Sequence, residues 1–242
     1  MFRKLVSLDE AMQILERRFH AKSVGVEQVS LSKAHQRVLA KEVKAPLNVP
    51  PFDRSTVDGY AVKAEDTFGA DEEHPITLKL VGRVAVGEMP EIAVKERTTV
   101  EIATGAPLPS GADAVVMMEY TIQKNNSVSI HSVVSKGENV LGAGSDIRKD
   151  ETVMKKNQAL SFRDIGVLAA LGFTKVDVYK RPKAAVISTG AEIVQPGESL
   201  PPGKIYDINA YTISAAVEEC GGQPLNFGII PDEIDELKAA LK

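Results

Sequence analysis

The segment Ala184-Ala185-Val186-Ile187-Ser188-Thr189-Gly190-Ala191-Glu192 decides the fold class of this 242-residue chain. Its apolar half has the form of a buried parallel strand and enters a turn of hydroxyl groups, glycine and a carboxylate. A helix is predicted over residues 210–220, capped by Asn209, and a second strand over residues 225–230. Strand, helix and strand form one βαβ unit, and residues 233–241 are expected to add a further helix.

A carboxylate follows each strand of this unit. Glu192 comes just after the first strand and Asp232 just after the second. Ligands of open α/β sheets bind beyond the carboxyl ends of the strands, so we expect the two side chains to share one edge. There they can hold a divalent cation such as Mg²⁺ against a phosphate. Taken singly, each carboxylate is more often a helix cap.

The predicted α/β unit is small. About 60 residues follow Tyr179, enough for two strands and two helices at ordinary element lengths. A parallel sheet needs cover on both faces and usually has more strands. The chain ends within a predicted helix at Leu241-Lys242. We therefore expect an α/β domain that is cut in the middle, and the alternative is that another chain covers the open edge.

The N-terminal stretch is expected to be helical. Ser7 and Glu10 form a predicted capping box, and Ser32 is predicted to cap a second, short helix. Prolines within residues 46–51 end any helix and favour an extended link, so a domain boundary is expected near residues 41–51. The apolar face of the first helix consists of Ala11, Met12, Ile14, Leu15 and Phe19.

The middle of the chain has strand character. Apolar residues alternate with polar ones over residues 76–86 and again over residues 100–102. Strands are also expected over residues 115–122 and 128–134, and Asn125-Asn126 between them is typical of a hairpin turn. Many short strands favour a small barrel or sandwich.

The chain after this region returns to mixed structure. Ser161 is predicted to cap a helix that ends at Gly172, and residues 175–179 alternate like a strand. The fold class is therefore mixed α/β and multidomain. We assign residues 1–45 and 145–179 to a helical or α+β first domain, residues 46–144 to a β-rich second domain and residues 180–242 to the first half of an α/β third domain.

Composition excludes several classes of function. The chain has 29 Lys and Arg residues against 33 Asp and Glu, a net charge of −4, so no nucleic-acid partner is expected. A single cysteine, Cys220, excludes a disulfide framework and a four-cysteine metal site. The sequence has no apolar window long enough for a membrane span and no signal-peptide core. We therefore expect no membrane partner and a cytoplasmic protein.

Two loops of the middle region concentrate polar residues. Residues 50–61, PPFDRSTVDGYA, hold two acids and an Asp-Gly turn, with Asp53 placed to cap and Asp58 to present a carboxylate from a rigid loop. Residues 104–116, TGAPLPSGADAVV, are stiffened by prolines, and Thr104 offers a hydroxyl. Stiff loops lower the entropy cost of binding a polar ligand, but each loop taken alone is more often a structural turn.

Together with Ser188-Thr189-Gly190 and Gly203-Lys204-Ile205-Tyr206-Asp207-Ile208-Asn209, these loops form four motifs in a fixed order. They resemble the molybdopterin molybdenumtransferase family of the bacterial MoeA type, which is similar to the E domain of gephyrin. The resemblance covers nearly the whole chain. It implies that the third domain is a three-layer α/β domain of the molybdopterin-binding kind.

The resemblance implies an enzyme of molybdenum-cofactor biosynthesis that inserts molybdate into adenylylated molybdopterin and releases AMP, with Mg²⁺ assisting. It implies a homodimer whose active site lies between the α/β domain of one subunit and the β-rich domain of the other. The molybdopterin adenylylating protein of the same pathway is an implied partner. Transferred by motif, the catalytic residues are Asp58, Thr104, Glu192 and Asp232, of which the last two also bind the metal; the substrate-binding residues are Asp146, Ser188, Thr189, Gly190, Asp207 and Asn209.

The chain departs from the family pattern in three places. Ala191 replaces an aspartate, Leu141-Gly142-Ala143 stands where arginines are common, with Arg148 as a substitute, and Val57 replaces a methionine. The family's later glycine- and proline-rich loops, which bind pterin phosphate and molybdate, are absent, so we expect residues 1–242 alone to be inactive. Two alternatives stay open: a non-enzymatic dimerising scaffold, and a divergent paralogue that binds another pterin or nucleotide.

Overall fold

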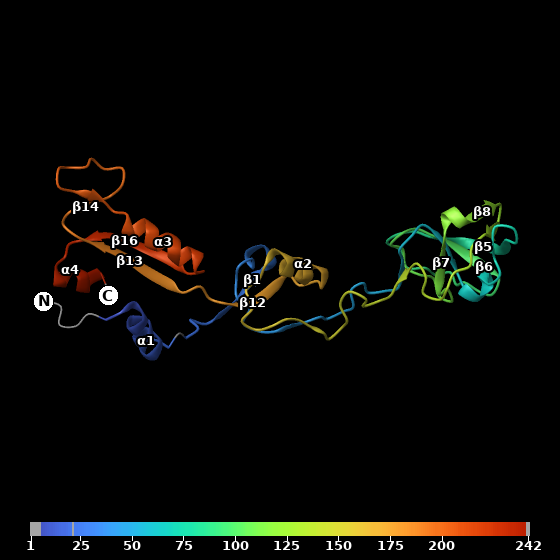
Figure 1. Ribbon diagram of the computed structural model, residues 1–242, viewed down its shortest axis with the longest axis horizontal. Helices are drawn as coiled ribbons and strands as arrows, with labels where there is room; N and C mark the ends of the chain where they lie inside the picture. The colour runs from blue at the N-terminus through green and yellow to red at the C-terminus, as the bar shows by residue number, and fades with distance from the viewer. Residues whose placement is uncertain (1–5, 21, 241–242) are drawn as a thin grey trace. The chain divides into compact units, whose positions relative to one another are not determined.

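A computed structural model describes residues 6–20 and 22–240 of the chain. The chain divides into two compact units (Figure 1). Unit 1 comprises residues 1–41 and 155–242, and unit 2 comprises residues 42–154. Each unit is described by itself below.

Unit 2 is built on a six-stranded sheet in the order β7-β4-β6-β5-β9-β8. All pairings are antiparallel except that between β5 and β6, so the β-rich region is one curled mixed sheet. The strands are β4 (Gly59–Val62), β5 (Ile76–Val84), β6 (Thr98–Ile102), β7 (Ala114–Met117), β8 (Thr121–Lys124) and β9 (Ser127–Ile130).

Strand β4 is buried on both faces because each face packs into its own apolar cluster. Tyr60 and Val62 join one cluster together with Leu78, and Ala61 joins the other together with Val100. Burial on both faces explains why β4 is a continuous apolar run rather than an alternating one. The strand therefore forms a rigid support directly after Asp58.

Two expectations for this region have different outcomes. The hairpin at Asn125-Asn126 is confirmed, since β8 and β9 pair across it and Asn125 has a φ of 53°. The single strand expected over residues 115–122 is wrong. The chain leaves the sheet after β7 in a 3₁₀ turn, η3 (Met118–Tyr120), where the Met118 N–H donates to the Asp58 carbonyl at 3.0 Å.

Short ladders frame the loops of unit 2. Strand β3 (Arg54–Ser55) pairs with β10 (Val140–Leu141), and β2 (Val43–Lys44) pairs with β11 (Thr152–Met154). A second 3₁₀ turn, η2 (Ala64–Thr67), follows β4.

Unit 1 contains a small antiparallel pair, β1 (Val26–Ser30) with β12 (Lys175–Tyr179), beside helix α2 (Phe162–Ala170). The predicted start and end of α2 are confirmed. Ser161 and Asp164 form a capping box at its first turn, and Gly172 has a φ of 79° just after its last turn.

The short helix predicted after Ser32 is wrong. Only a 3₁₀ turn, η1 (Leu31–Lys33), forms there, and Ser32 instead shares a side-chain hydrogen bond with Ser30 at 2.9 Å. Gln36 then takes a φ of 60°, which ends any helix. The chain beyond it bridges antiparallel to residues 159 and 178, so long-range pairing replaces the helix.

The α/β part of unit 1 confirms the predicted βαβ unit. Strands β13 (Lys183–Thr189) and β16 (Gln223–Ile230) are parallel, and α3 (Asn209–Glu219) lies against both (Figure 1). The insertion between β13 and α3 carries a small parallel pair, β14 (Ile193–Val194) and β15 (Ile205–Tyr206). Helix α4 (Ile234–Ala240) follows β16.

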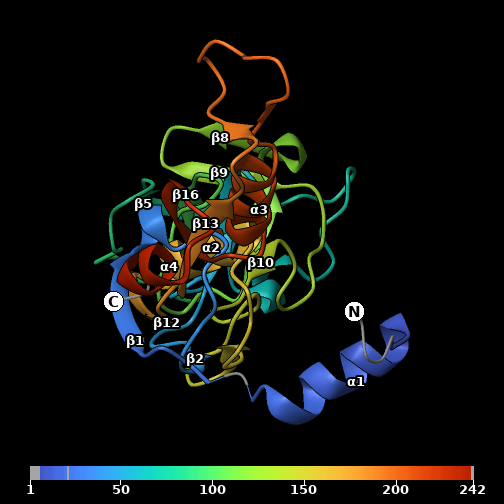
Figure 2. The ribbon, with the colours of Figure 1, turned by 90° about the vertical axis from the view of Figure 1, so that its left-hand side faces the viewer.

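Helix α1 (Leu8–Arg18) begins where the capping pattern predicts, because the Ser7 hydroxyl accepts from the Glu10 N–H at 3.2 Å. It buries none of its side chains, and its large apolar side chains are exposed to solvent. Figure 2 shows the course of its backbone. Among the described residues, no helix has both the length and the apolar character needed to cross a membrane.

Candidate functional site

Asp58 and Thr104 meet in unit 2 although they are 46 residues apart in the sequence. The Thr104 N–H donates to Asp58 Oδ1 at 2.8 Å, and the Thr104 hydroxyl donates to the same oxygen at 3.0 Å. Both side chains are exposed to solvent. These two hydrogen bonds lower the pKa of Asp58, the backbone one more strongly than the side-chain one, because both favour the ionised carboxylate.

Gly59 is required directly after Asp58. A Cβ atom at Gly59 would lie 2.0 Å from the carbonyl oxygen of Val116 on β7. The Asp-Gly pair of the first motif therefore serves two purposes, since the glycine lets β4 approach β7 closely and the aspartate faces the solvent at the end of that strand.

Strand β3 brings three loops of unit 2 together. On one side it pairs with β10, and on the other Arg54 bridges to Pro107. The loop after β10 is fastened by Asp53, whose Oδ1 accepts the Ala143 N–H at 2.7 Å. The loops around residues 53–58, 104–108 and 140–146 thus lie side by side.

Asp146 lies on the third of these loops and is exposed. Its backbone N–H donates to the Val49 carbonyl at 3.0 Å. Its side chain makes no hydrogen bond to a described residue, so the backbone of the loop alone sets the direction of the side chain. Asp146 therefore shares a loop cluster with Asp58 and Thr104 but makes no hydrogen bond to them.

In unit 1, the residues after β13 and β16 lie at one edge of the sheet. Thr189 is in register with Ile230, so Glu192 and Asp232 follow at the same carboxyl end. Ser188 is buried, whereas Thr189, Glu192 and Asp232 are exposed. This shared edge is the placement that the βαβ pattern predicts.

Gly190 has a φ of 145°, and the Glu192 carboxylate folds back over it, with Oε2 2.8 Å from the place that a Cβ would occupy. The turn after β13 is therefore close-packed against its own carboxylate. Within residues 6–20 and 22–240, no three His, Cys, Asp or Glu side chains gather in a way that could hold a metal ion. A cation at this edge would take most of its ligands from water or substrate.

Asp207, rather than Asn209, caps α3. Asp207 is 2% exposed, and its Oδ1 accepts the Ala210 N–H at 3.0 Å, whereas Asn209 is the exposed first residue of the helix. The predicted cap at Asn209 is therefore wrong by two positions. Asp207 Oδ2 is buried and has no hydrogen-bond partner among the described residues.

Two residues that shape the site were not predicted to do so. Ser55 is buried, and its hydroxyl donates to the Val57 carbonyl at 2.6 Å and accepts the Val57 N–H at 3.2 Å. Asp53 was expected to cap locally, but it bonds to Ala143, 90 residues away. Both lie inside the polar loop 50–61, whose density of polar residues was the available signal.

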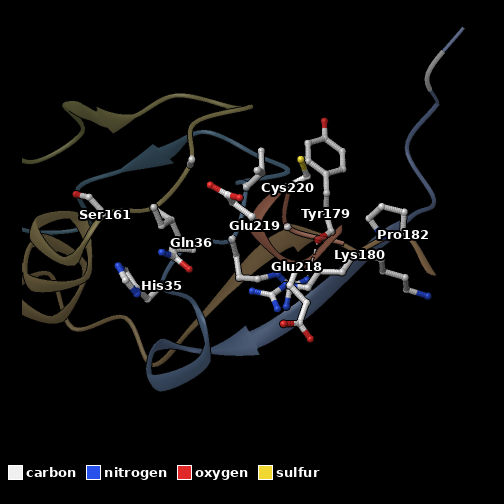
Figure 3. A pocket seen from close by; sticks show the side chains of 15 residues that line it. His35, Gln36, Ser161, Tyr179, Lys180, Pro182, Glu218, Glu219 and Cys220 are labelled. Carbon is white, nitrogen blue, oxygen red and sulfur yellow. Dashed lines mark hydrogen bonds between the residues drawn. The ribbon is translucent and has the colours of Figure 1, made fainter. Parts of the chain in front are cut away.

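Unit 1 also has an open cavity of about 800 Å³ to which none of the predicted site residues contributes (Figure 3). Its walls carry Lys180 and Arg181 along with Glu218 and Glu219. The buried Arg37 in its wall already donates to Glu27 Oε1 at 2.6 Å and to the Tyr179 carbonyl at 2.8 Å. Mixed charges and a satisfied arginine favour no particular ligand.

Comparison with known families matches both parts of the chain. Residues 6–172 match the family described as MoeA N-terminal region (domain I and II). Residues 185–242 match the family described as a probable molybdopterin binding domain.

The chain is also similar to named proteins. A molybdopterin molybdenumtransferase of Nostoc sp. is 38% identical over 206 residues, which cover 85% of this chain and 47% of that protein. Molybdopterin molybdenumtransferase 2 of Mycobacterium tuberculosis is 36% identical over 213 residues, covering 88% and 53%. A solved molybdopterin biosynthesis moeA protein of Pyrococcus horikoshii OT3 matches with a TM-score of 0.89 and 35% identity over 98% of this chain and 63% of that one. The chain spans about half the length of the curated relatives it matches.

Proposed function

The chain belongs to the MoeA family, and from this we propose that it forms part of an enzyme of molybdenum-cofactor biosynthesis that inserts molybdate into adenylylated molybdopterin and releases AMP. The proposal concerns a protein of the relatives' full length. Two relatives that are 36–38% identical to this chain are named molybdopterin molybdenumtransferases, which supports the transferase activity.

One structural observation carries the proposal. Asp58 and Thr104, contributed by two separate motifs, are joined by two hydrogen bonds at 2.8 and 3.0 Å and face solvent together. The pair leaves a carboxylate oxygen and a hydroxyl oxygen next to each other on the exposed surface of unit 2. A pre-positioned polar pair is what a substrate-binding surface requires.

The edge after β13 and β16 would carry a second group of functional residues, within unit 1. Glu192 and Asp232 would bind Mg²⁺, whose charge stabilises the substrate's phosphate oxygens. Two carboxylates suit a cation that keeps several waters and takes substrate oxygens as further ligands. Thr189 and Gly190 would contact the substrate from the same turn, and the buried Ser188 would act by supporting that turn.

The remaining assignments follow from position. Asp146 would contact substrate from the loop beside Asp58, and Asn209 from the first turn of α3. Asp207 is buried, so it would act by holding the start of α3. The family resemblance supports a cytoplasmic homodimer and a molybdopterin adenylylating protein as the partner that delivers the substrate.

The test is molybdate-dependent release of AMP from adenylylated molybdopterin by a full-length family protein that contains residues 1–242. We expect Asp58→Asn to lower kcat/KM roughly 100-fold. Glu119→Gln, which also removes one exposed carboxylate from unit 2, is the matched control and should leave turnover unchanged. Residues 1–242 alone should show no turnover.

A non-enzymatic scaffold would give a different result. If the full-length protein had no molybdate-dependent turnover, or if Asp58→Asn and Glu192→Ala both turned over at the unsubstituted rate, the proposed function would be wrong. The folded state of each variant is checked by the hydrogen-exchange pattern of the unit that carries the substitution, unit 2 for Asp58→Asn and unit 1 for Glu192→Ala.

A further inference from the structure

The turn that carries Thr104 has no free backbone donor. Anion-binding turns rich in glycine hold phosphates by N–H groups that point at the ligand. Here the three successive N–H groups are already used within unit 2: those of Thr104, Gly105 and Ala106 donate to Asp58 Oδ1, the Ser55 carbonyl and the Ala103 carbonyl at 2.8, 2.8 and 3.0 Å. The turn therefore offers no backbone donor to a phosphate or a molybdate ion.

The side chains of the pair are also acceptors toward solvent. The Thr104 hydroxyl has one proton, and it donates that proton to Asp58 Oδ1. Its oxygen lone pairs are left for a ligand. A carboxylate only accepts hydrogen bonds, and no described residue donates to Asp58 Oδ2.

The exposed surface of the pair is thus two neighbouring acceptors, Thr104 Oγ1 and Asp58 Oδ2. The Asp58 carboxylate is ionised at neutral pH, as its lowered pKa is consistent with, and a charged acceptor binds a hydrogen-bond donor more strongly than a neutral one. An oxyanion would meet two acceptors and a negative charge, and would be repelled.

Two adjacent acceptors fit two adjacent donors. A 2-amino-4-oxopteridine ring presents its exocyclic amino group beside a ring N–H, which is this donor pair. Adenine fits less well, because the ring nitrogen beside its amino group is an acceptor. A divalent cation would find only one carboxylate and one hydroxyl here, with Oδ1 already accepting two hydrogen bonds.

We infer that the Asp58–Thr104 pair recognises the amino and ring N–H edge of the pterin, and that it does not bind the phosphate or the molybdate. The inference rests on the proposed function, which supplies a pterin as substrate. It assigns the pterin end of the substrate to the β-rich unit and leaves the anionic groups to other residues.

The test is a titration of ¹⁵N-labelled residues 1–242, followed at the Thr104 and Gly105 amide signals. The probes are pterin, lumazine, adenosine, inorganic phosphate and MgCl₂. Lumazine keeps the two-ring shape but has a carbonyl in place of the amino group, so it presents an acceptor to the carboxylate. We expect pterin to shift these signals and to bind at least tenfold more tightly than lumazine or adenosine.

Variants separate the two acceptors. Thr104→Val keeps the N–H bond to Asp58 but removes the hydroxyl, and should weaken pterin binding about tenfold. Thr104→Ser restores the hydroxyl and should restore binding. Asp58→Asn should weaken binding roughly 100-fold, and Glu119→Gln should have no effect.

Several outcomes would overturn the inference. They are equal affinity for pterin and lumazine, tighter binding of adenosine, shifts caused by phosphate or MgCl₂ instead of pterin, or no pterin-dependent shift up to the solubility limit. Loss of turnover in full-length Asp58→Asn without loss of pterin binding would refute the inference and leave the proposed function standing. If the Asp58→Asn variant loses pterin binding but the unsubstituted full-length protein has no molybdate-dependent turnover, the proposed function is refuted instead.

Discussion

The Asp58–Thr104 pair belongs to a unit built on a six-stranded sheet. In the described part of the chain, Glu192 and Asp232 follow a sheet of only two strands, β13 and β16. The first pair is fixed by hydrogen bonds to backbone and side chain. Among the described residues, no hydrogen bond reaches the carboxylates of Glu192 and Asp232. Hydrogen bonds within unit 2 therefore position the Asp58–Thr104 pair, whereas the backbone of the turns alone positions Glu192 and Asp232.

The strands next to these two groups of residues also differ in burial. Both faces of β4 are buried, but only Val186 and Ser188 of β13 are buried. The α/β part exposes large apolar side chains: Ile205, Ile208, Tyr211, Ile213, Phe227 and Ile234. From this contrast we infer that tight packing of the sheet holds Asp58 and Thr104 in place in unit 2. At the β13 edge, local turns and caps hold the backbone instead.

The largest expected effect tests the packing of unit 2. Gly59→Ala would place a methyl group 2.0 Å from the Val116 carbonyl oxygen, and neither backbone can yield without disturbing the sheet. We expect the free energy of unfolding of unit 2 to fall by about 3 kcal/mol or more. Denaturation followed by hydrogen exchange at the β4 and β7 amides measures it.

Gly166→Ala is the control, and it should raise the free energy of unfolding instead of lowering it. Gly166 lies within α2, and its Cβ would meet no atom within 4 Å. Alanine should stabilise the helix by about 0.5–1 kcal/mol. A loss below 1 kcal/mol for Gly59→Ala would show that close packing does not position Asp58.

Local signals predicted the elements that depend on neighbouring residues. Ser161 and Gly172 mark the ends of α2 because a cap acts within one turn of the helix. Asn125 turns the β8–β9 hairpin because asparagine tolerates positive φ. The order of the motifs, known from a family resemblance, located Asp58 and Thr104.

Contacts between distant residues could not be predicted from the sequence. The helix after Ser32 fails because the chain there pairs with residues 158–160 and 177–179. Asp53 has a cap-like pattern, yet its partner is Ala143. Which groups donate in the turn at Thr104 depends on Ser55 and Asp58, two further long-range contacts.

A smaller effect tests the local cap at the α/β edge. Asp207→Ala removes the acceptor of the Ala210 N–H and should lower the free energy of unfolding by about 1 kcal/mol. Asp207→Asn keeps an acceptor oxygen in that place and should cost less than half as much. Chemical denaturation gives both values, with hydrogen exchange of the first turn of α3 as the local readout. An equal cost for the two variants would mean that the cap bond does not position α3.

The smallest effect concerns the pKa of Asp58. The Thr104 N–H lowers this pKa most and the Thr104 hydroxyl lowers it further, so Thr104→Val should raise it only part of the way to its usual value. Because the folded pKa lies below that of the unfolded chain, the stabilisation is complete above about pH 4 and is lost as the pH falls through the folded pKa. The variant should therefore lose less stability on acidification.

A ¹³C titration of the Asp58 carboxyl measures the change directly. Asp71 is the matched control, since its pKa is lowered by bonds from His74 that the substitution does not touch. An unchanged pKa of Asp58 in Thr104→Val would mean that the hydroxyl does not donate to the carboxylate. The hydroxyl proton would then be available to a ligand, the pair would present a donor as well as acceptors, and an oxyanion would become an acceptable partner for the Asp58–Thr104 pair.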